Sequence, residues 1–362
     1  MGALYLGYIL GGGDQTSGNN GLTDQMLALR WVHENIRDFG GDPERVTVMG
    51  ASAGAKSIAA LMLLPESRTY FSQTLLSSGA YQCIRSEETA KKVAERYFKF
   101  LKADDPAEIL TMDTDRLLSA QKELCAGEST CVFGPVADGA VIPYDWEKIL
   151  HSDRYWSGRA VVGSCRGELA FYKFIDPDLT EHAPAVAEGL FGLNAEIAKE
   201  DYERLCREAV RKNGTCDEET KKDLWGKVLS DYMYRTYSSR LAKILEKNGS
   251  TVYKYSMEYA PAIHCLDQNL AFETKDGGEL LCLDEETRQA NLRVGQVIFA
   301  AYTNFICSGD PNGEGVPVWN EYRDAKDKEN RYLQMCWDTE SQEAPEPADD
   351  TLSGFPEQVY RL

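Results

Sequence analysis

The stretch Arg45-Val-Thr-Val-Met-Gly-Ala-Ser-Ala-Gly-Ala-Lys-Ser-Ile-Ala-Ala-Leu-Met-Leu-Leu64 decides how this chain folds. Its first five residues, RVTVM, are rich in β-branched side chains and predict a short strand. The next five residues, Gly50-Ala-Ser-Ala-Gly54, form a tight turn, and the small and apolar residues that follow predict a helix. A serine between two glycines at a strand-to-helix turn is exposed for nucleophilic attack. Ser52 is therefore the first candidate functional residue.

The residues around Ser52 have expected roles of their own. Gly50 and Gly54 are expected to leave room where the strand enters the helix, and the backbone N–H of Ala53 is the evident oxyanion donor. The pattern fixes only three of five positions, so an ordinary glycine- and serine-containing loop is the alternative. The strand before the turn and the helix after it favour a nucleophile at Ser52.

The rest of the chain supplies further strands and helices around this unit. The short apolar runs Gln73–Leu76 and Arg159–Gly163 predict strands covered on both faces, as in a mostly parallel sheet. Alternating residues predict a further strand over Thr251–Met257. Helical periodicity covers residues 21–39, 86–122, 187–247 and 285–307. We expect one α/β domain over residues 1–362, in which the charged segment 187–247 is an inserted helical cap. The acidic tail, Glu340–Ser353, is predicted to be an irregular surface segment.

A serine nucleophile needs a base, and the chain has four histidines. His33 lies in the first predicted helix, and His151 and His182 lie in polar segments, so we expect these three at the surface. His264 follows a late predicted strand on a loop, where it can act as the base; a structural loop histidine is the alternative.

The acid must lie between the serine and the histidine, because this kind of triad runs in the order serine, acid, histidine. Many carboxylates lie there, and most are expected to form a solvated face. Glu168 stands out because it comes just after the apolar strand RAVVG of residues 159–163. Functional groups collect at the carboxyl ends of such strands. Glu168 is the predicted acid.

Composition excludes several classes of partner. The 362 residues carry a formal net charge of −19, which repels the phosphates of nucleic acids and of anionic membranes. No run of about 18 apolar residues is present, and the N-terminus lacks the pattern of a secretory signal. The ten cysteines are scattered without metal-ligand spacing. We therefore expect a cytoplasmic protein with reduced thiols, no metal and no organic cofactor.

Several longer motifs resemble the type-B carboxylesterases, a family that includes cholinesterases, para-nitrobenzyl-type esterases and the non-catalytic neuroligins. The segments that carry the resemblance span nearly the whole chain outside the predicted cap; they are Gly18–Gln25, Phe39–Pro43, Gly50–Gly54, Ser77–Gly79, Phe133–Gly139, Gly163–Glu168, His264 with Asp267 and Phe272, Cys307–Asn312 and Trp319–Tyr322. Ala51 replaces a common glutamate, and Asp267 replaces another. The resemblance implies the α/β-hydrolase fold and carboxylic-ester hydrolysis with Ser52, Glu168 and His264 as the triad.

The resemblance also implies that strands at the N-terminus are missing, because the family's His-Gly-Gly oxyanion loop has no counterpart before Met1. Gly11-Gly-Gly13 is interpreted as a flexible loop. The absent segment would leave the nucleophile strand at an unpaired sheet edge and would weaken the oxyanion hole. The expected activity is hydrolysis of small-molecule esters. The alternatives are an inactive or weakly active fragment and a non-catalytic binding module, and the oligomeric state is left open.

Overall fold

The computed structural model describes residues 2–7, 17–103, 105–127, 132–171, 187–272, 284–323 and 333–346. Within these residues the centre of the molecule is a sheet of six strands in the order β1-β2-β5-β6-β7-β8. The strands are β1 (Thr47–Ala51), β2 (Gln73–Ser77), β5 (Arg159–Cys165), β6 (Thr251–Met257), β7 (Leu333–Trp337) and β8 (Gln342–Pro345). All neighbours are parallel except β7 and β8. The prediction of a mostly parallel sheet is confirmed.

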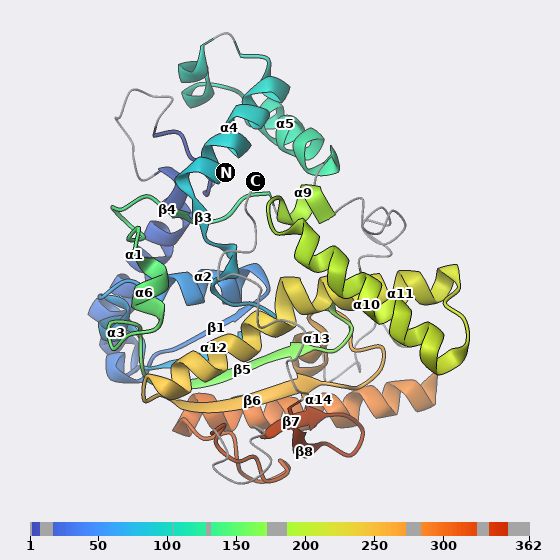
Figure 1. The fold of residues 1–362 in the computed structure, drawn as a ribbon. Helices are drawn as coiled ribbons and strands as arrows, with labels where there is room; N and C mark the ends of the chain where they lie inside the picture. Colours follow the sequence, from blue (N-terminus) through green and yellow to red (C-terminus); the bar gives the residue numbers. More distant parts are fainter. Residues whose placement is uncertain are drawn as a thin grey trace.

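The helices cover both faces of the sheet (Figure 1). They are α1 (Asn20–Asn35), α2 (Ala53–Leu61), α3 (Ser67–Tyr70), α4 (Glu87–Leu101), α5 (Thr114–Gly127), α6 (Trp146–Leu150), α9 (Ala187–Phe191), α10 (Ala195–Asn213), α11 (Glu218–Ser230), α12 (Thr236–Lys247), α13 (Leu266–Phe272) and α14 (Glu285–Ser308). A separate pair of short strands, β3 (Arg85–Ser86) and β4 (Val136–Ala137), also forms. A π-helix, Asp231–Arg235, joins α11 to α12.

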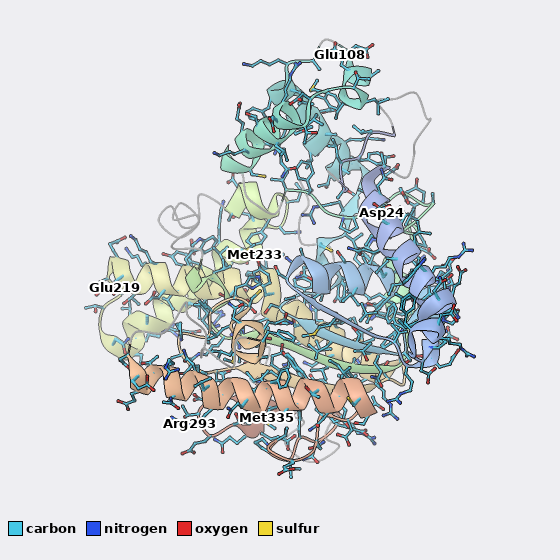
Figure 2. The ribbon with its side chains drawn as sticks, turned by 180° about the vertical axis from the view of Figure 1, so that it is seen from behind. Asp24, Glu108, Glu219, Met233, Arg293 and Met335 are labelled. Carbon is cyan, nitrogen blue, oxygen red and sulfur yellow. The ribbon has the colours of Figure 1, made fainter. Side chains whose placement is uncertain are left out.

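Alternating side chains of each strand pack into two different cores, because successive residues of a strand point to opposite faces. Leu76 and Val162 belong to the core beneath α2 and α12. Leu75 and Val161 belong to the core on the other face, where α13 and α14 pack. Figure 2 shows α14 crossing that second face, with Arg293 labelled on the helix. The result is a three-layer α/β/α arrangement.

The longer helices begin and end at capping residues that are visible in the sequence. Ser86 caps α4 by accepting a hydrogen bond from the backbone N–H of Thr89 at 3.2 Å. Asp284 caps α14 in the same way, accepting from Thr287 N–H at 2.7 Å. Gly309 ends α14 in the left-handed conformation, with φ of 78°, which glycine adopts without strain. These local signals explain why the predicted helix near residue 285 has the observed limits.

The tail differs from its prediction. Gln342–Pro345 is not irregular but forms β8, antiparallel to β7, with Gln334 paired to Ala344. The backbone of this acidic segment pairs with the backbone of β7. The residue pattern of the sequence did not predict this pairing. Residues 347–362 lie outside the described part of the chain. So do His182 and the glycines 11–13, and the predictions about them stay predictions.

Candidate active site

The turn between β1 and α2 holds Ser52 in a conformation that is rare for residues other than glycine. Ser52 has φ of 51° and ψ of −116°, and it directly precedes the first residue of α2. Such backbone strain persists only where the surrounding structure enforces it, and it is typical of functional sites. The backbone N–H of Ser52 donates to the carbonyl of Ser77 at 2.9 Å. The half-buried serine is thus fixed at the carboxyl end of the parallel sheet.

The two glycines of the turn are not equivalent. A Cβ added at Gly50 would lie 2.5 Å from the carbonyl carbon of Gly54, a contact that backbone atoms cannot relieve. A Cβ added at Gly54 would have nothing within 4 Å. The expected need for room at the strand-to-helix turn therefore applies to Gly50, while the space beside Gly54 is open.

Glu168 begins the short 3-10 helix Glu168–Phe171, and His264 lies on a loop at the same end of the sheet. Cys165, the last residue of β5, is paired with Met257, the last residue of β6. Glu168 follows the first strand and His264 follows the second. Gly167 N–H donates to the carbonyl of Ala262 at 2.9 Å, which ties the two loops together. This register brings the predicted acid to the predicted base.

The acid contacts the base directly. Oε2 of Glu168 lies 2.5 Å from Nδ1 of His264, and the side chain of Glu168 is fully buried. Its other oxygen, Oε1, accepts from Ser78 Oγ at 2.6 Å and from the backbone N–H of Cys165 at 2.7 Å. A carboxylate at Nδ1 holds the proton of a neutral imidazole on that nitrogen. Nε2 is then free to accept a proton from another group.

Electrostatics favour the protonated form of this histidine. Burial by itself lowers the pKa of His264, but hydrogen bonds to Cys265 and Glu168 outweigh burial and raise the pKa above its usual value of 6.5. A carboxylate next to an imidazole stabilises the imidazolium that forms when the ring takes a proton. The pair can therefore receive a proton and hold the resulting charge.

The segment Ser77–Gly79, just after β2, joins the serine to the acid. Ser77 accepts from the backbone of Ser52, and Ser78 donates its hydroxyl to Glu168. A Cβ at Gly79 would lie 2.5 Å from the carbonyl oxygen of Ser52, so only glycine allows this close approach. The family resemblance includes this segment. It did not predict the role of the Ser78 hydroxyl, because that role depends on a contact between residues that are distant in the sequence.

The proposed nucleophile, Ser52, and the proposed base, His264, are not hydrogen-bonded to each other in the described part of the chain. Hydrogen bonds of this kind are often long or misaligned in a protein without substrate. The backbone N–H of Ala53, at the start of α2, has no partner within the helix and can act as a donor.

An aromatic side chain that sequence reasoning missed borders the histidine. Tyr234 is almost fully buried, and its ring centroid lies 4.5 Å from that of His264. It belongs to the π-helix Asp231–Arg235, and such irregular turns are frequent at functional sites. Met233 belongs to the same π-helix, and its label in Figure 2 shows that this helix lies near the middle of the molecule.

A buried polar cluster lies behind the acid. Asp267 is fully buried, and its Oδ2 accepts from Ser77 Oγ at 2.6 Å, from the hydroxyl of Tyr255, and from the hydroxyl of Tyr302 at 3.2 Å. Burial raises the pKa of Asp267 even though Ser77 and Tyr255 donate to it. This cluster connects β2 to α13, the helix that begins just after His264. The sequence marked Asp267 only through its family motif.

Two other histidines, His33 and His151, lie away from this site. His33 is half-buried on α1, with its ring 5.6 Å from that of Tyr70, and His151 is exposed directly after α6. Among the described residues, no group of three or more His, Cys, Asp or Glu side chains is arranged to hold a metal ion. In the same part of the chain, no helix is both long and apolar enough to cross a membrane.

Comparisons with known proteins agree with this geometry. The model of the carboxylesterase family matches residues 4–351. The chain is 25% identical over 340 residues to carboxylesterase 1C of Rattus norvegicus, covering 90% of this chain and 61% of that protein. It is 28% identical over 325 residues to para-nitrobenzyl esterase of Bacillus subtilis, covering 84% of this chain and 62% of that protein.

A solved structure matches as well. The carboxylesterase EST55 of Geobacillus stearothermophilus superimposes with a TM-score of 0.80 and 26% identity, covering 96% of this chain and 71% of that chain.

Neuroligin-2 of Rattus norvegicus is 26% identical, covering 92% of this chain and 42% of that protein. The chain thus spans less than two thirds of the length of the curated relatives named here.

Proposed function

Since this chain belongs to the carboxylesterase family, we propose that it hydrolyses carboxylic esters through an acyl-enzyme formed on Ser52. The observation that carries the proposal is the direct contact between Glu168 and His264 beside the strained turn of Ser52. A buried acid, a base in contact with it and a serine hydroxyl on a tight turn are the parts that this chemistry needs.

The proposed reaction has two halves. Nε2 of His264 removes the proton of Ser52 as Oγ attacks the ester carbonyl, and Glu168 stabilises the imidazolium. The backbone N–H of Ala53 donates to the oxyanion of the tetrahedral intermediate. The alcohol then leaves with the proton from His264. Water, activated by the same imidazole, attacks the acyl-enzyme and releases the carboxylic acid.

We further propose that helices α9–α11 form a cap over this site. They lie beyond the carboxyl ends of β5 and β6 (Figure 1), where parallel sheets gather ligand sites. Helix α12, in contrast, packs into the core against the sheet through Leu241 and Leu245. The proposed ester is a small molecule. None of the described cysteines forms a disulfide, which favours a cytoplasmic protein.

The test is hydrolysis of para-nitrophenyl acetate and butyrate by the purified 362-residue chain, together with labelling by a fluorophosphonate. Both signals should disappear in Ser52→Ala, since the nucleophile is lost. Ser57→Ala, one turn further along α2, is the matched control and should retain both. A folded wild-type protein that neither hydrolyses nor labels would contradict the proposal and would favour a non-catalytic binding module.

A further inference from the structure

A buried lysine lies one helical turn beyond the proposed nucleophile. Lys56 is only 9% exposed. Among the described residues, no carboxylate lies within 4.0 Å of its ammonium group, and Nζ donates no hydrogen bond to a protein atom. An ammonium group carries three N–H donors, and Nζ of Lys56 is not among the fully covered side-chain atoms of the described residues that lack a partner, so it remains open to solvent or to a ligand. The donors of Lys56 are therefore available to a group outside the protein.

The side chain of Lys56 reaches an aromatic ring that also borders the proposed base. Residues four apart lie on one face of a helix, and helical side chains lean toward the helix N-terminus, so the stem of Lys56 lies toward Ser52. Its Nζ is 4.6 Å from the ring centroid of Tyr234. The same ring packs against His264 at 4.5 Å. Lys56 and His264 therefore contact the same aromatic ring.

The acid of the site does not neutralise this lysine. Glu168 uses Oε2 for His264 and Oε1 for Ser78 and the backbone of Cys165. A cation–π contact stabilises Lys56 in part, but it satisfies neither the charge nor the N–H donors. What is left is a positive charge beside a site that would otherwise be suited to neutral esters.

We propose that Lys56 binds a carboxylate carried by the ester substrate, so that the enzyme prefers half-esters of dicarboxylic acids or esters with a free carboxylate on the alcohol. This rests on the ester hydrolysis proposed above. The net charge of −19 opposes anionic substrates at long range, but salt screens exposed charges over about 8 Å. At contact distance, the partly desolvated ammonium group therefore dominates.

Two pairs of esters test the two positions of the carboxylate. The acyl-side pair is mono-para-nitrophenyl adipate and para-nitrophenyl hexanoate. The alcohol-side pair is meta-acetoxybenzoate and phenyl acetate. In Lys56→Met, the kcat/KM ratio of the anionic to the neutral ester should fall about tenfold or more in one pair, because a charge-assisted contact is lost. The affected pair identifies the side of the ester that carries the carboxylate.

Two variants control for charge and shape. Lys99→Met removes an exposed charge on α4 and should leave both ratios unchanged. Lys56→Arg keeps the charge and should retain most of the preference. If Lys56→Met does not fold, as judged by circular dichroism, Lys56→Gln takes its place. Hydrolysis of the neutral esters with both ratios unchanged would overturn the role of Lys56 and leave the esterase intact.

A binding measurement separates the two proposals if no ester is turned over. Calorimetric titration with monomethyl adipate needs no catalysis and compares wild type with Lys56→Met. Binding that is lost in the variant supports the carboxylate site even though the esterase proposal has failed. Equal binding by both proteins, or none by either, overturns it.

Discussion

Glu168 is fully buried, and its carboxylate accepts hydrogen bonds from three groups of the described residues. His264, Ser78 and the backbone of Cys165 all donate to its carboxylate. A carboxylate beside an imidazole stabilises the imidazolium. Hydrogen bonding with Cys265 and Glu168 raises the pKa of His264 against the effect of burial. Glu168, which orients the proposed base, thus also contributes to raising the pKa of that base.

At this scale we predict the effect of Glu168→Gln. A base must be unprotonated, so kcat/KM of the wild type should rise with pH and have its midpoint above the usual histidine pKa of 6.5. Glu168→Gln removes the negative charge, so the midpoint should move to lower pH. The rate constant kcat should fall by about 10²- to 10⁴-fold. The pH profile of para-nitrophenyl butyrate hydrolysis measures both effects.

A variant with the same chemical change but no contact to the site is the control for this profile. Glu66→Gln alters an exposed carboxylate between α2 and α3 and should leave the midpoint and kcat unchanged. An unchanged midpoint in Glu168→Gln would show that Glu168 does not control the base.

At the scale of elements, the site depends on the close approach of β1, α2 and the end of β2. Gly50 faces the backbone of Gly54, and Gly79 faces the backbone of Ser52. Both contacts are too short for a Cβ, so glycine is required there by packing between elements. Gly54, in the first turn of α2, faces open space.

We therefore predict opposite effects of alanine at the two glycines of the turn. Gly50→Ala should lower the free energy of unfolding by about 2 kcal/mol or more, because overpacking against backbone cannot relax easily. Gly54→Ala should be neutral, or stabilising by up to about 1 kcal/mol, since alanine is the better helix former. Urea denaturation of the two variants gives the comparison. Equal losses would mean that the elements do not fit together as described.

At the scale of the whole molecule, a buried ion pair joins the C-terminal part of the described chain to the central sheet. Nζ of Lys254, on β6, lies 3.0 Å from Oε1 of Glu346, just after β8, and both side chains are over nine-tenths buried. Tyr322 donates to Oε2 of Glu346 at 2.5 Å. Breaking a buried pair leaves an uncompensated charge, so this contact holds three distant segments together.

The stability of the protein at acidic pH should depend on the ion pair between Lys254 and Glu346. Burial alone would raise the pKa of Glu346, but the ammonium groups of Lys254 and Lys243 outweigh burial and lower the pKa to about 2 from its usual 4.5. A lowered carboxyl pKa gives stability that is present above pH 4.5 and lost as pH falls toward 2. The free energy of unfolding of the wild type should therefore decrease across this interval.

Glu346→Gln tests the assignment. It should cost about 3 kcal/mol or more at pH 7, because Lys254 is left buried without its counter-ion. The variant should also lose less stability than the wild type between pH 4.5 and 2. Glu340→Gln, at an exposed position, is the control and should behave as the wild type in chemical denaturation at each pH. If Glu346→Gln lost as much stability as the wild type between pH 4.5 and 2, this ion pair would be excluded as the source of the wild-type loss.

The sequence by itself determined what depends on neighbours along the chain. The strand, the turn and the helix around Ser52 are contiguous, so their side-chain periods predict them directly. His264 and Glu168 were found because each follows a predicted strand, and carboxyl ends of parallel strands meet at one edge. The family resemblance added the fold and the expected ester hydrolysis.

Only the tertiary structure decided which distant side chains touch. Ser78 with Glu168, Tyr234 with His264 and Lys56, and Lys254 with Glu346 join residues from different elements. No local period encodes such pairs, because they depend on strand register and on how helices lie across the sheet. For the same reason β8 escaped prediction: its hydrogen bonds are supplied by β7, and an acidic segment shows no strand pattern until that partner is in place.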